Sequence, residues 1–396
     1  MVKVFEFGPA PLANAFLKRK QLNCAESFYP LNVFFCKYCN LLQLKDIVDP
    51  RILFRDYVYV SSTSEVFGEH FKDFSQKSII RFHLSHKSLV IDIGSNDGIL
   101  LEPFKKKNVN VLGIEPAKNI ARMARKKGIN TVAEFISFKL AESIVEKYGL
   151  ADLVTATNVF AHINDLDTVV MSVKKLISKN GVFVIEAPYL IDFLKNNLFD
   201  TVYHEHLSYL SITPLKLLFK HYSMKIFDVE RVNTHGGSIR VYIANQSSNH
   251  IITKAVKNMV ALEKKLQLDK VETYRNFAKK IMRNKRLLNS LLTRLKQKGK
   301  TIVGYGAPAK GNTLLNYFNI GKNILDYIVD DSIFKQGLFT PGTHIPVVSP
   351  NTLKVTIPDF ILILAWNFAP SIMKNYEWIK KRGGKFIVPV PVPKII

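Results

Sequence analysis

The chain has 396 residues, of which 47% are hydrophobic and 22% charged, with a net charge of +24. This composition is typical of a globular protein with two or three domains, and no apolar run approaches the roughly 18 residues of a membrane helix. Because the N-terminus lacks a signal peptide core and three cysteines are too few for a disulfide framework, we expect a cytoplasmic protein without membrane contacts.

The N-terminal lobe is expected to be small and largely irregular. Residues 8–14 have a loop composition, and residues 29–35 predict a strand that leads into a C-x-x-C pair, Cys36 and Cys39. Such a pair is half of a structural zinc site, and Cys24 is a candidate third ligand. Because a second cysteine pair is absent and no histidine lies nearby, a reduced thiol pair is favoured over bound zinc.

Two tyrosines alternate in the segment that follows. Tyr57 and Tyr59 would point to one face of an extended segment. Such residues usually pack in a core, but a phenol aimed into a cleft could hold a substrate oxygen instead. Residues 65–81 then have the pattern of a helix that leads into the next domain.

Residues 90–100 organise the rest of the chain. A short apolar run ends there in a polar turn bounded by glycines, and a helix-like pattern begins. A second apolar run ends at Glu115, whose carboxylate would accept hydrogen bonds from the two hydroxyls of a ribose. Dinucleotide-binding enzymes and S-adenosylmethionine (SAM) methyltransferases share this layout.

The first loop separates these two classes. A pyrophosphate needs G-x-G-x-x-G, but residues 94–98 read GSNDG and are flanked by Asp92. The carboxylates of Asp92 and Asp97 would repel a pyrophosphate and suit a cationic sulfonium. The loop therefore favours SAM, and a glycine turn in an ordinary α/β domain is the structural alternative.

Strands and helices alternate from about residue 88 to 250, which predicts a doubly wound parallel sheet. Ligands in such sheets bind at the carboxyl ends of the strands. Phe135 follows the third strand and could face an adenine ring. Asn158 and His162 follow the fourth strand and should lie near the cleft, although a lone histidine there could equally be structural.

Residues 199–206 concentrate ionisable and hydrogen-bonding side chains in the sequence FDTVYHEH. An H-x-H pair with a carboxylate could bind a metal, but the spacing lacks a third ligand. Acid–base chemistry fits better, because His206 titrates near neutral pH, Glu205 can fix a tautomer and Tyr203 can stabilise an oxyanion. Further on, a glycine turn feeds a strand expected to end at Arg240, which suits a phosphate or carboxylate.

Residues 254–300 contain 15 lysines and arginines but only 3 acidic residues. Apolar residues recur there at helical spacing, so we expect one long helix with a solvated basic face. We expect no nucleic-acid binding, because the segment lacks interleaved exposed aromatics and any known binding motif. A basic surface that attracts an anionic sugar nucleotide is a milder alternative.

A second α/β unit follows this helix. Residues 301–312 predict a strand, a glycine loop and a helix start, and residues 325–331 predict a second strand with an acidic tip. The pattern is Rossmann-like, but Pro308 and Lys310 replace fingerprint positions. Lys310 and the helix N-terminus could still hold a phosphate.

Together these motifs resemble the sugar C-methyltransferases that act on nucleotide-linked keto-deoxysugars, the family of the tetronitrose and mycarose C-3 methyltransferases. The similarity covers nearly the whole chain in order. The resemblance implies an α/β fold: a class I SAM methyltransferase (Rossmann-like) core with an N-terminal zinc-binding lobe and a C-terminal Rossmann-like domain. The matching segments are PLANAFL, DYVYVSSTS, VIDIGSNDGILL, LGIEPAKNIA, ATNVFAHINDL, FDTVYHEHLSYLS, FDVERVNTHGGSIRVY, VGYGAPAKGNTLLNY and KQGLFTPGTHIPV.

The resemblance implies that His206 removes a proton from the carbon beside the ketone, and that Tyr203, Glu205, His162 and Tyr57 surround that carbon and its oxygen. From the sequence pattern or the resemblance, the residues expected to contact SAM are Asp92, Gly94, Ser95, Asn96, Asp97, Gly98, Glu115, Pro116, Phe135, Asn158 and Val159. Those expected to bind the nucleotide-linked sugar are Arg240, Tyr305, Lys310, Asn312 and Asp330.

The expected domains are an N-terminal lobe (1–75), a methyltransferase domain (76–250), a basic helical connector (251–300) and a C-terminal nucleotide-sugar domain (301–396). Family members carry a further C-x-x-C before the PLAN segment, and this sequence begins after that point. The four-thiolate zinc site therefore cannot form, either because the N-terminus is incomplete or because this branch has lost the metal. The expected chemistry does not need zinc.

Two other enzymatic functions stay open, an NAD(P)-dependent sugar-nucleotide oxidoreductase and a sugar O-methyltransferase. The first loop argues against the oxidoreductase, as does the lack of Tyr-x-x-x-Lys spacing around the candidate tyrosines. A catalytically silent binding protein would not need the intact residues 203–206. We expect a monomer or weak oligomer whose partner is a nucleotide-linked ketosugar.

Overall fold

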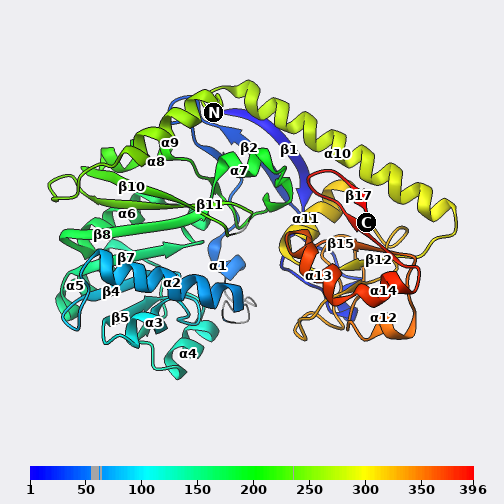
Figure 1. Cartoon of the computed structure of the whole chain (residues 1–396), viewed down its shortest axis with the longest axis horizontal. Helices are drawn as coiled ribbons and strands as arrows, with labels where there is room; N and C mark the ends of the chain where they lie inside the picture. The colour runs from blue at the N-terminus through cyan, green and yellow to red at the C-terminus, as the bar shows by residue number, and fades with distance from the viewer. Residues whose placement is uncertain (55–61, 63–64, 235) are drawn as a thin grey trace.

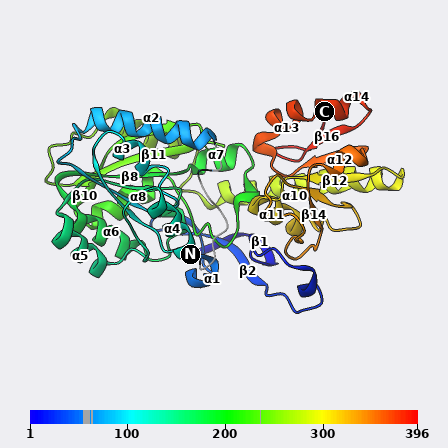
Figure 2. The ribbon, with the colours of Figure 1, turned by 90° about the horizontal axis from the view of Figure 1, so that it is seen from below.

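The computed structural model describes residues 1–54, 62, 65–234 and 236–396. Two α/β units lie at opposite ends of the molecule (Figure 1). The N-terminal strands and the long helix α10 (Val271–Gln297) lie across the space between the two units, as Figures 1 and 2 show from two directions. The alternation of strand and helix expected from the sequence is present in both units.

The N-terminal lobe contains a four-stranded antiparallel sheet, to which a distant part of the chain contributes one strand. The lobe is therefore more regular than the sequence indicated. The order of the sheet is β1-β2-β3-β9, and β1 continues through the glycine and proline that were expected to lie in a loop. The fourth strand, β9, comes from the middle of the chain and pairs with β3. The strands are β1 (Val2–Ala10), β2 (Tyr29–Phe35), β3 (Leu42–Leu44) and β9 (Ser208–Tyr209).

The first α/β unit contains a seven-stranded sheet in the described part of the chain, in the order β10-β11-β8-β7-β4-β5-β6. Numbered along the chain, this order is 3-2-1-4-5-7-6 read from β6, and β11 is antiparallel to both of its neighbours. This is the class I SAM methyltransferase fold. The strands are β4 (Leu89–Ile93), β5 (Asn110–Ile114), β6 (Thr131–Val132), β7 (Ala151–Thr157), β8 (Ile177–Pro188), β10 (Met224–Val232) and β11 (Ser238–Asn245).

Helices cover both faces of this sheet because alternate strand residues point to opposite sides. Val90 packs with α2 and α3, whereas its neighbour Ile91 belongs to the core beneath α5, α6 and α8. The continuous apolar strands follow from this double burial. The helices of the unit are α2 (Glu65–Arg81), α3 (Leu101–Lys105), α4 (Lys118–Lys126), α5 (Phe138–Tyr148), α6 (Leu166–Leu176), α7 (Leu190–Lys195) and α8 (Ile212–His221), and α1 (Pro50–Phe54) precedes them.

The basic segment forms two helices, so the expectation of one long helix was wrong. Helix α9 (Lys254–Lys265) ends before a turn in which Gln267 adopts a left-handed backbone with φ of 56°, and α10 then begins. The apolar stripe of α10 is buried, and Phe277 packs against Phe5 of β1. Among the described helices, none combines the length and apolar character needed to cross a membrane.

The C-terminal unit is also Rossmann-like, with the order β14-β13-β12-β15-β16-β17, and only β17 is antiparallel to its neighbour. Its strands are β12 (Ile302–Tyr305), β13 (Ile328–Val329), β14 (Val347–Val348), β15 (Phe360–Ile363), β16 (Lys385–Val388) and β17 (Lys394–Ile395). Its helices are α11 (Ala309–Phe318), α12 (Thr352–Val355), α13 (Ala369–Asn375) and α14 (Glu377–Lys381).

Candidate active site

The loop after β4 is shaped by close packing at Gly94. Its φ is 70°, and a Cβ atom at this position would lie 2.6 Å from Val159 Cγ2. Only glycine combines this backbone conformation with so close an approach. The loop after β4 and the loop after β7 therefore meet at the carboxyl end of the sheet, where both were predicted to contact a cofactor.

Several buried polar atoms at this meeting point have no hydrogen-bond partner among the described residues. They are Ser95 Oγ, Asp97 Oδ1 and Asn158 Oδ1. The other carboxylate oxygen of Asp97 pairs with Lys127, so the negative charge of the loop is partly neutralised, which the sequence did not indicate. Buried polar atoms without partners are costly, and a polar ligand would satisfy them.

Two acids flank the loop. Glu115 accepts hydrogen bonds from the backbone N–H of Asn96 (2.9 Å) and Ala117 (2.8 Å), and burial raises the pKa of its carboxyl. Asp92 lies inside the sheet, accepts a 2.6 Å bond from Thr155 Oγ1, and burial raises its pKa to about 7. Glu115 thus stands at the strand tip, whereas Asp92 is hydrogen-bonded to the neighbouring strand β7 within the sheet.

The remaining predicted cofactor contacts lie around this loop. Pro116 is half-buried beside Glu115, and Phe135, three residues after the end of β6, is 46% exposed. An exposed aromatic ring, an acid at the second strand tip and unpaired buried oxygens fit a ligand with an aromatic base, hydroxyls and a charged amino-acid part. The residues present therefore fit SAM.

His206 is held by hydrogen bonds on both ring nitrogens. Its Nδ1 lies 2.7 Å from the Thr201 carbonyl oxygen, and its Nε2 lies 2.8 Å from the Tyr203 hydroxyl. Because a carbonyl can only accept, Nδ1 carries the proton in the neutral ring, and Nε2 is the basic nitrogen that accepts from Tyr203. The ring of His162 lies 4.9 Å from that of His206, between centroids.

His162 also links this histidine pair to the cofactor loop. Its backbone N–H donates to the carbonyl of Val159 (2.8 Å), and Val159 packs on Gly94. The structure therefore brings together two predicted sets that are far apart in sequence, the SAM loop and the residues around His206. Tyr57 lies outside the described residues.

The two other ionisable residues of the 203–206 segment face the N-terminal lobe. Glu205 is buried and accepts a 2.7 Å hydrogen bond from the side-chain amide of Asn14. His204 Nε2 lies 3.2 Å from the carbonyl of Pro30, and burial lowers the pKa of the ring. His204 is thus a packed neutral residue that ties the loop to the lobe.

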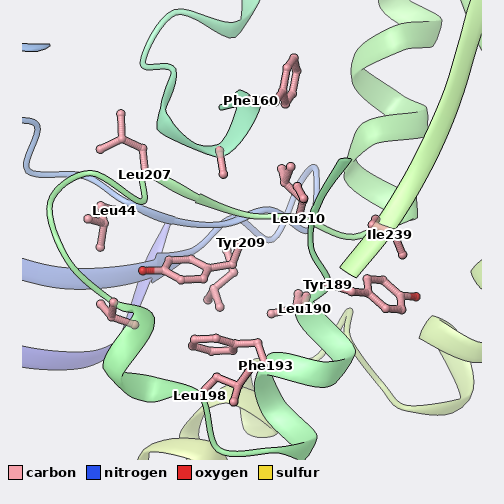
Figure 3. Packing of buried hydrophobic residues seen from close by; sticks show 14 of the residues in the cluster. Leu44, Phe160, Tyr189, Leu190, Phe193, Leu198, Leu207, Tyr209, Leu210 and Ile239 are labelled. Atoms are coloured by element: carbon pink, nitrogen blue, oxygen red, sulfur yellow. The ribbon is translucent and has the colours of Figure 1, made fainter. Parts of the chain in front are cut away.

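Figure 3 shows how this loop is anchored. Tyr209 packs against Phe193 of the methyltransferase unit, with ring centroids 5.0 Å apart, and Leu207 lies near Leu44 of the N-terminal lobe (Figure 3). The N–H of Leu207 donates to the Ala161 carbonyl (2.8 Å), and its carbonyl accepts from Leu44 (2.8 Å). The chain segment after His206 is therefore fixed on both sides.

Arg240 does not occupy the position expected of an anion ligand. It is the third residue of β11 rather than the strand end, and only 3% of its surface is exposed. Its guanidinium pairs with Glu186 at 2.7 Å and with Glu230 at 3.4 Å, and Glu186 also contacts His70 at 2.6 Å. We expected the Arg240 guanidinium to bind a phosphate or carboxylate of a ligand. The structure instead pairs it with two glutamates of the protein itself.

The four predicted residues of the C-terminal unit lie near the ends of β12 and β13, with differing environments. The Tyr305 hydroxyl donates to Asp331 (2.9 Å), and burial raises its pKa. Lys310 contacts Asn367, and burial lowers its pKa. Asn312 is buried and donates to the Ala13 carbonyl of the N-terminal lobe (2.7 Å).

Asp330 accepts from the backbone N–H of Ala307 (2.6 Å) and of Ser332 (2.8 Å). A cavity of about 420 Å³ opens between the N-terminal lobe and the far half of α11. Its lining is uncharged and includes Phe28, Asn316 and Tyr317. A much smaller neighbouring cavity is lined by Tyr203 and shares Asn316 with the larger one.

The thiols of Cys36 and Cys39 are free and half-buried. Within the described ranges, no group of three or more histidine, cysteine or acidic side chains could hold a metal ion. Two thiols alone do not fit a structural zinc ion, which needs four ligands.

Sequence reasoning assigned no role to several residues that shape the site. Asn14 and Lys127 contact predicted site residues from elsewhere in the chain. Trp366 donates its indole N–H to Asp200 at 2.5 Å across 166 positions. Of these residues, Asp200 alone had a sequence signal, because it lies in the segment 199–206 that stood out for its ionisable side chains.

Comparison with known proteins gives three consecutive matches along the chain. Residues 1–54 match a family described as "Putative zinc binding domain", residues 67–227 match "Methyltransferase domain", and residues 233–391 match "C-methyltransferase C-terminal domain". The chain is 37% identical over 393 residues to the C-methyltransferase NovU of Streptomyces niveus, covering 99% of this chain and 94% of that protein.

Other similarities are partial. A ubiquinone biosynthesis O-methyltransferase of Pelagibacter ubique is 28% identical over 185 residues, which cover 43% of this chain and 75% of that protein. A solved SAM-dependent methyltransferase from Clostridium acetobutylicum is 16% identical, with a TM-score of 0.37, over 45% of this chain and 91% of that chain. The magnesium protoporphyrin IX methyltransferase of Synechocystis is 12% identical, with a TM-score of 0.36, over 49% and 91%.

Proposed function

Because the chain belongs to the family of SAM-dependent C-methyltransferases, we propose that it methylates the carbon beside the keto group of a nucleotide-linked deoxysugar. The observation that carries this proposal is the hydrogen bonding of His206, which leaves Nε2 as a basic nitrogen next to a phenol. Methyl transfer to an oxygen needs less acid–base equipment. A C–H bond beside a ketone needs a base and a stabiliser for the enolate oxygen.

When bound, SAM supplies the electrophilic methyl group. Glu115 would accept hydrogen bonds from its ribose hydroxyls, and the loop from Gly94 to Gly98 would hold the amino-acid part. Ser95 Oγ and Asn158 Oδ1 would gain the partners that they lack. Phe135 would cover the base from the solvent side.

His206 Nε2 would take the proton from the carbon beside the ketone. Its Nδ1–H stays on the Thr201 carbonyl throughout, which orients the ring and stabilises the positive charge that develops. The Tyr203 hydroxyl, which donates to Nε2 beforehand, would turn its proton toward the enolate oxygen. His162, beside His206, would add a second polar group to this pocket.

The sugar nucleotide would lie between the two α/β units, with its anionic part on the C-terminal side. Lys310 and Asp330 are the proposed contacts there, together with Tyr305 and Asn312. Arg240 is left out of this site because Glu186 and Glu230 neutralise it. The reduced state of the thiols in the N-terminal lobe suits a cytoplasmic enzyme, and no step passes through a metal.

The proposal can be tested by proton exchange at the acidic carbon. In D2O, the wild-type enzyme should exchange the hydrogen beside the ketone of a thymidine diphosphate-linked 4-keto-6-deoxyhexose, followed by NMR. The His206→Asn variant should exchange and methylate roughly 100- to 10,000-fold more slowly, the usual effect of losing a general base. Its affinity for SAM, measured by calorimetry, should stay near that of the wild type.

Three outcomes would contradict the proposal. Full proton exchange by His206→Asn would remove this residue from the base role. Loss of SAM affinity together with activity would indicate a structural role instead. A product methylated on oxygen, with no exchange at carbon, would favour a sugar O-methyltransferase.

A further inference from the structure

The 3-10 helix η4 (Phe199–Thr201) belongs to the methyltransferase unit, but the C-terminal unit holds it. The ring of Phe199 stacks on Phe318 of α11 with centroids 5.0 Å apart. The indole N–H of Trp366, which follows β15, donates to Asp200 Oδ2 at 2.5 Å. Two successive residues of η4 are thus fixed by side chains from the other end of the molecule.

The next residue of η4 contacts His206. The carbonyl oxygen of Thr201 accepts the Nδ1–H of His206 at 2.7 Å. The turn is closed internally, because the N–H of Thr201 donates to the Leu198 carbonyl at 3.0 Å and the N–H of Val202 donates to the Phe199 carbonyl at 3.0 Å. A movement of the Asp200 side chain would therefore move the carbonyl that orients His206.

Burial of the Asp200 carboxylate lowers the stability of the fold. The Asp200 side chain is fully buried, and its second carboxylate oxygen, Oδ1, has no hydrogen-bond partner among the described residues. The ammonium of Lys310 lies 4.4 Å from the centroid of the Trp366 ring, and these two described residues, Lys310 and Asp200, do not form an ion pair. An apolar residue of similar size would be cheaper in such a place, so packing alone does not explain a carboxylate.

We propose that Asp200 is a positioning residue: through the Trp366–Asp200 hydrogen bond, the C-terminal unit fixes the Thr201 carbonyl and with it the tautomer of His206. This inference rests on the proposed function, in which His206 is the base. It assigns the C-terminal unit a second task besides contacting the sugar nucleotide. Lys310, a proposed contact of the substrate's anionic part, lies over the ring of Trp366, and Trp366 holds the turn that orients the base.

The test uses the full chain labelled with 15N-histidine, and the resonances of His206 are identified by their loss in His206→Asn. Long-range 1H–15N spectra distinguish the Nδ1–H from the Nε2–H tautomer. The Trp366→Phe variant should lower the ratio of the Nδ1–H to the Nε2–H tautomer of His206 roughly 2- to 10-fold. This is the effect expected when one neutral hydrogen bond, here from Nδ1–H to the Thr201 carbonyl, is weakened. The same variant should slow proton exchange at the sugar carbon by a similar factor, with SAM affinity unchanged.

The chain offers a matched control, because it contains two tryptophans. Trp378→Phe, on α14, should leave the tautomer ratio and the exchange rate at wild-type values. A second pair of variants covers a failure of Trp366→Phe to fold. Asp200→Asn keeps an acceptor for the indole and should retain the wild-type ratio, whereas Asp200→Leu keeps the packing but loses the acceptor and should lower it.

An unchanged tautomer ratio in folded Trp366→Phe or Asp200→Leu would overturn the inference. A lower melting temperature without a change in the ratio would do the same, since it would show only a structural role. These results are separable from the proposed function. If His206→Asn loses proton exchange while Trp366→Phe does not, the base stands and the positioning role falls; if His206→Asn keeps exchange, the proposed function itself falls.

Discussion

The two α/β units use the same local geometry around their first loops. In the first unit, Glu115 at the tip of the second strand accepts from a first-loop N–H (Asn96) and from the N–H two residues after itself. In the second, Asp330 accepts from a first-loop N–H (Ala307) and again from the N–H two residues after itself. The acid in both units closes the loop onto the second strand.

The units differ in what surrounds this shared geometry. Around the first loop, Ser95 Oγ, Asp97 Oδ1 and Asn158 Oδ1 are buried without partners in the described residues. Around the second loop, Tyr305 contacts Asp331 and Lys310 contacts Asn367, and Asn312 Oδ1 is the one buried polar side-chain atom in residues 301–312 that lacks a partner among the described residues. An acid-tipped second strand therefore does not identify a cofactor site by itself, because the same contact also serves to hold a loop.

Substitution of the matched glycines should separate the two units most strongly. Gly94 (φ 70°) and Gly306 (φ 79°) would each place a Cβ within 2.6 or 2.7 Å of a neighbouring side chain. Gly94→Ala should weaken SAM binding about 100-fold or more, because the loop must move away from Val159, and Gly306→Ala should leave SAM affinity within about 2-fold. Calorimetry measures both, and each variant should lose about 1 to 3 kcal/mol of stability.

Equal losses of SAM affinity in the two glycine variants would contradict the assignment of the cofactor to the first unit. A loss confined to Gly306→Ala would reverse that assignment. Thermal unfolding of both variants serves as the control for general damage.

The acids should give a smaller contrast of the same kind. Glu115→Gln should weaken SAM binding roughly 10- to 100-fold, since a charged acceptor for two ribose hydroxyls becomes a neutral one. Asp330→Asn should leave SAM affinity unchanged and weaken binding of the nucleotide-linked sugar. Titration of each variant with S-adenosylhomocysteine and with thymidine diphosphate measures both effects. A loss of cofactor affinity in Asp330→Asn as large as that in Glu115→Gln would contradict the assignment of separate ligands to the two units.

The smallest expected difference between the two units is in how their buried strands make the free energy of unfolding depend on pH. Burial raises the pKa of Asp92 to about 7 from 3.8, whereas the corresponding strand of the second unit, β12, contains no carboxylate. The unfolded chain gives up this proton at a lower pH than the folded protein, so ionisation of Asp92 lowers stability as the pH rises from about 4 to about 7. Asp92→Asn should remove this loss.

Denaturant unfolding without SAM measures this effect. The stability of Asp92→Asn relative to the wild type should rise by about 2 kcal/mol between pH 5 and pH 8. A difference between the two proteins that stays constant with pH would show that Asp92 ionises normally in the folded state.

The parts of the fold that depend on local pattern were predictable. The strand ending before Gly94, the acid tip at Glu115 and the helix Glu65–Arg81 all follow from periodicity and turn residues over short stretches. The break before α10 was missed because Gln267 is not a residue type that signals a left-handed turn. The pattern of apolar residues on both sides of the break continues with little change.

Contacts across long stretches of sequence could not be read from the chain. Arg240 was expected to await an anion, because nothing near it in sequence reveals that Glu186 lies opposite on the neighbouring strand β8. The pairing of Asp200 with Trp366 depends on how two domains meet, and local pattern carries no such information. The positions of the proposed site residues were expected at strand ends, but their partners were visible only in the structure.

The strand β9 has a consequence for how the enzyme is made. Strands β1 to β3 leave the ribosome long before Ser208–Tyr209, the strand that completes their sheet. At synthesis rates of about 5 to 20 residues per second, the edge of β3 waits for several seconds to half a minute without its final neighbour. During that time the nascent chain exposes an open strand edge, which favours association with other chains. The arrival of β9 closes that edge and, in the same event, docks the segment that carries His206, so the sheet and the proposed base are completed together.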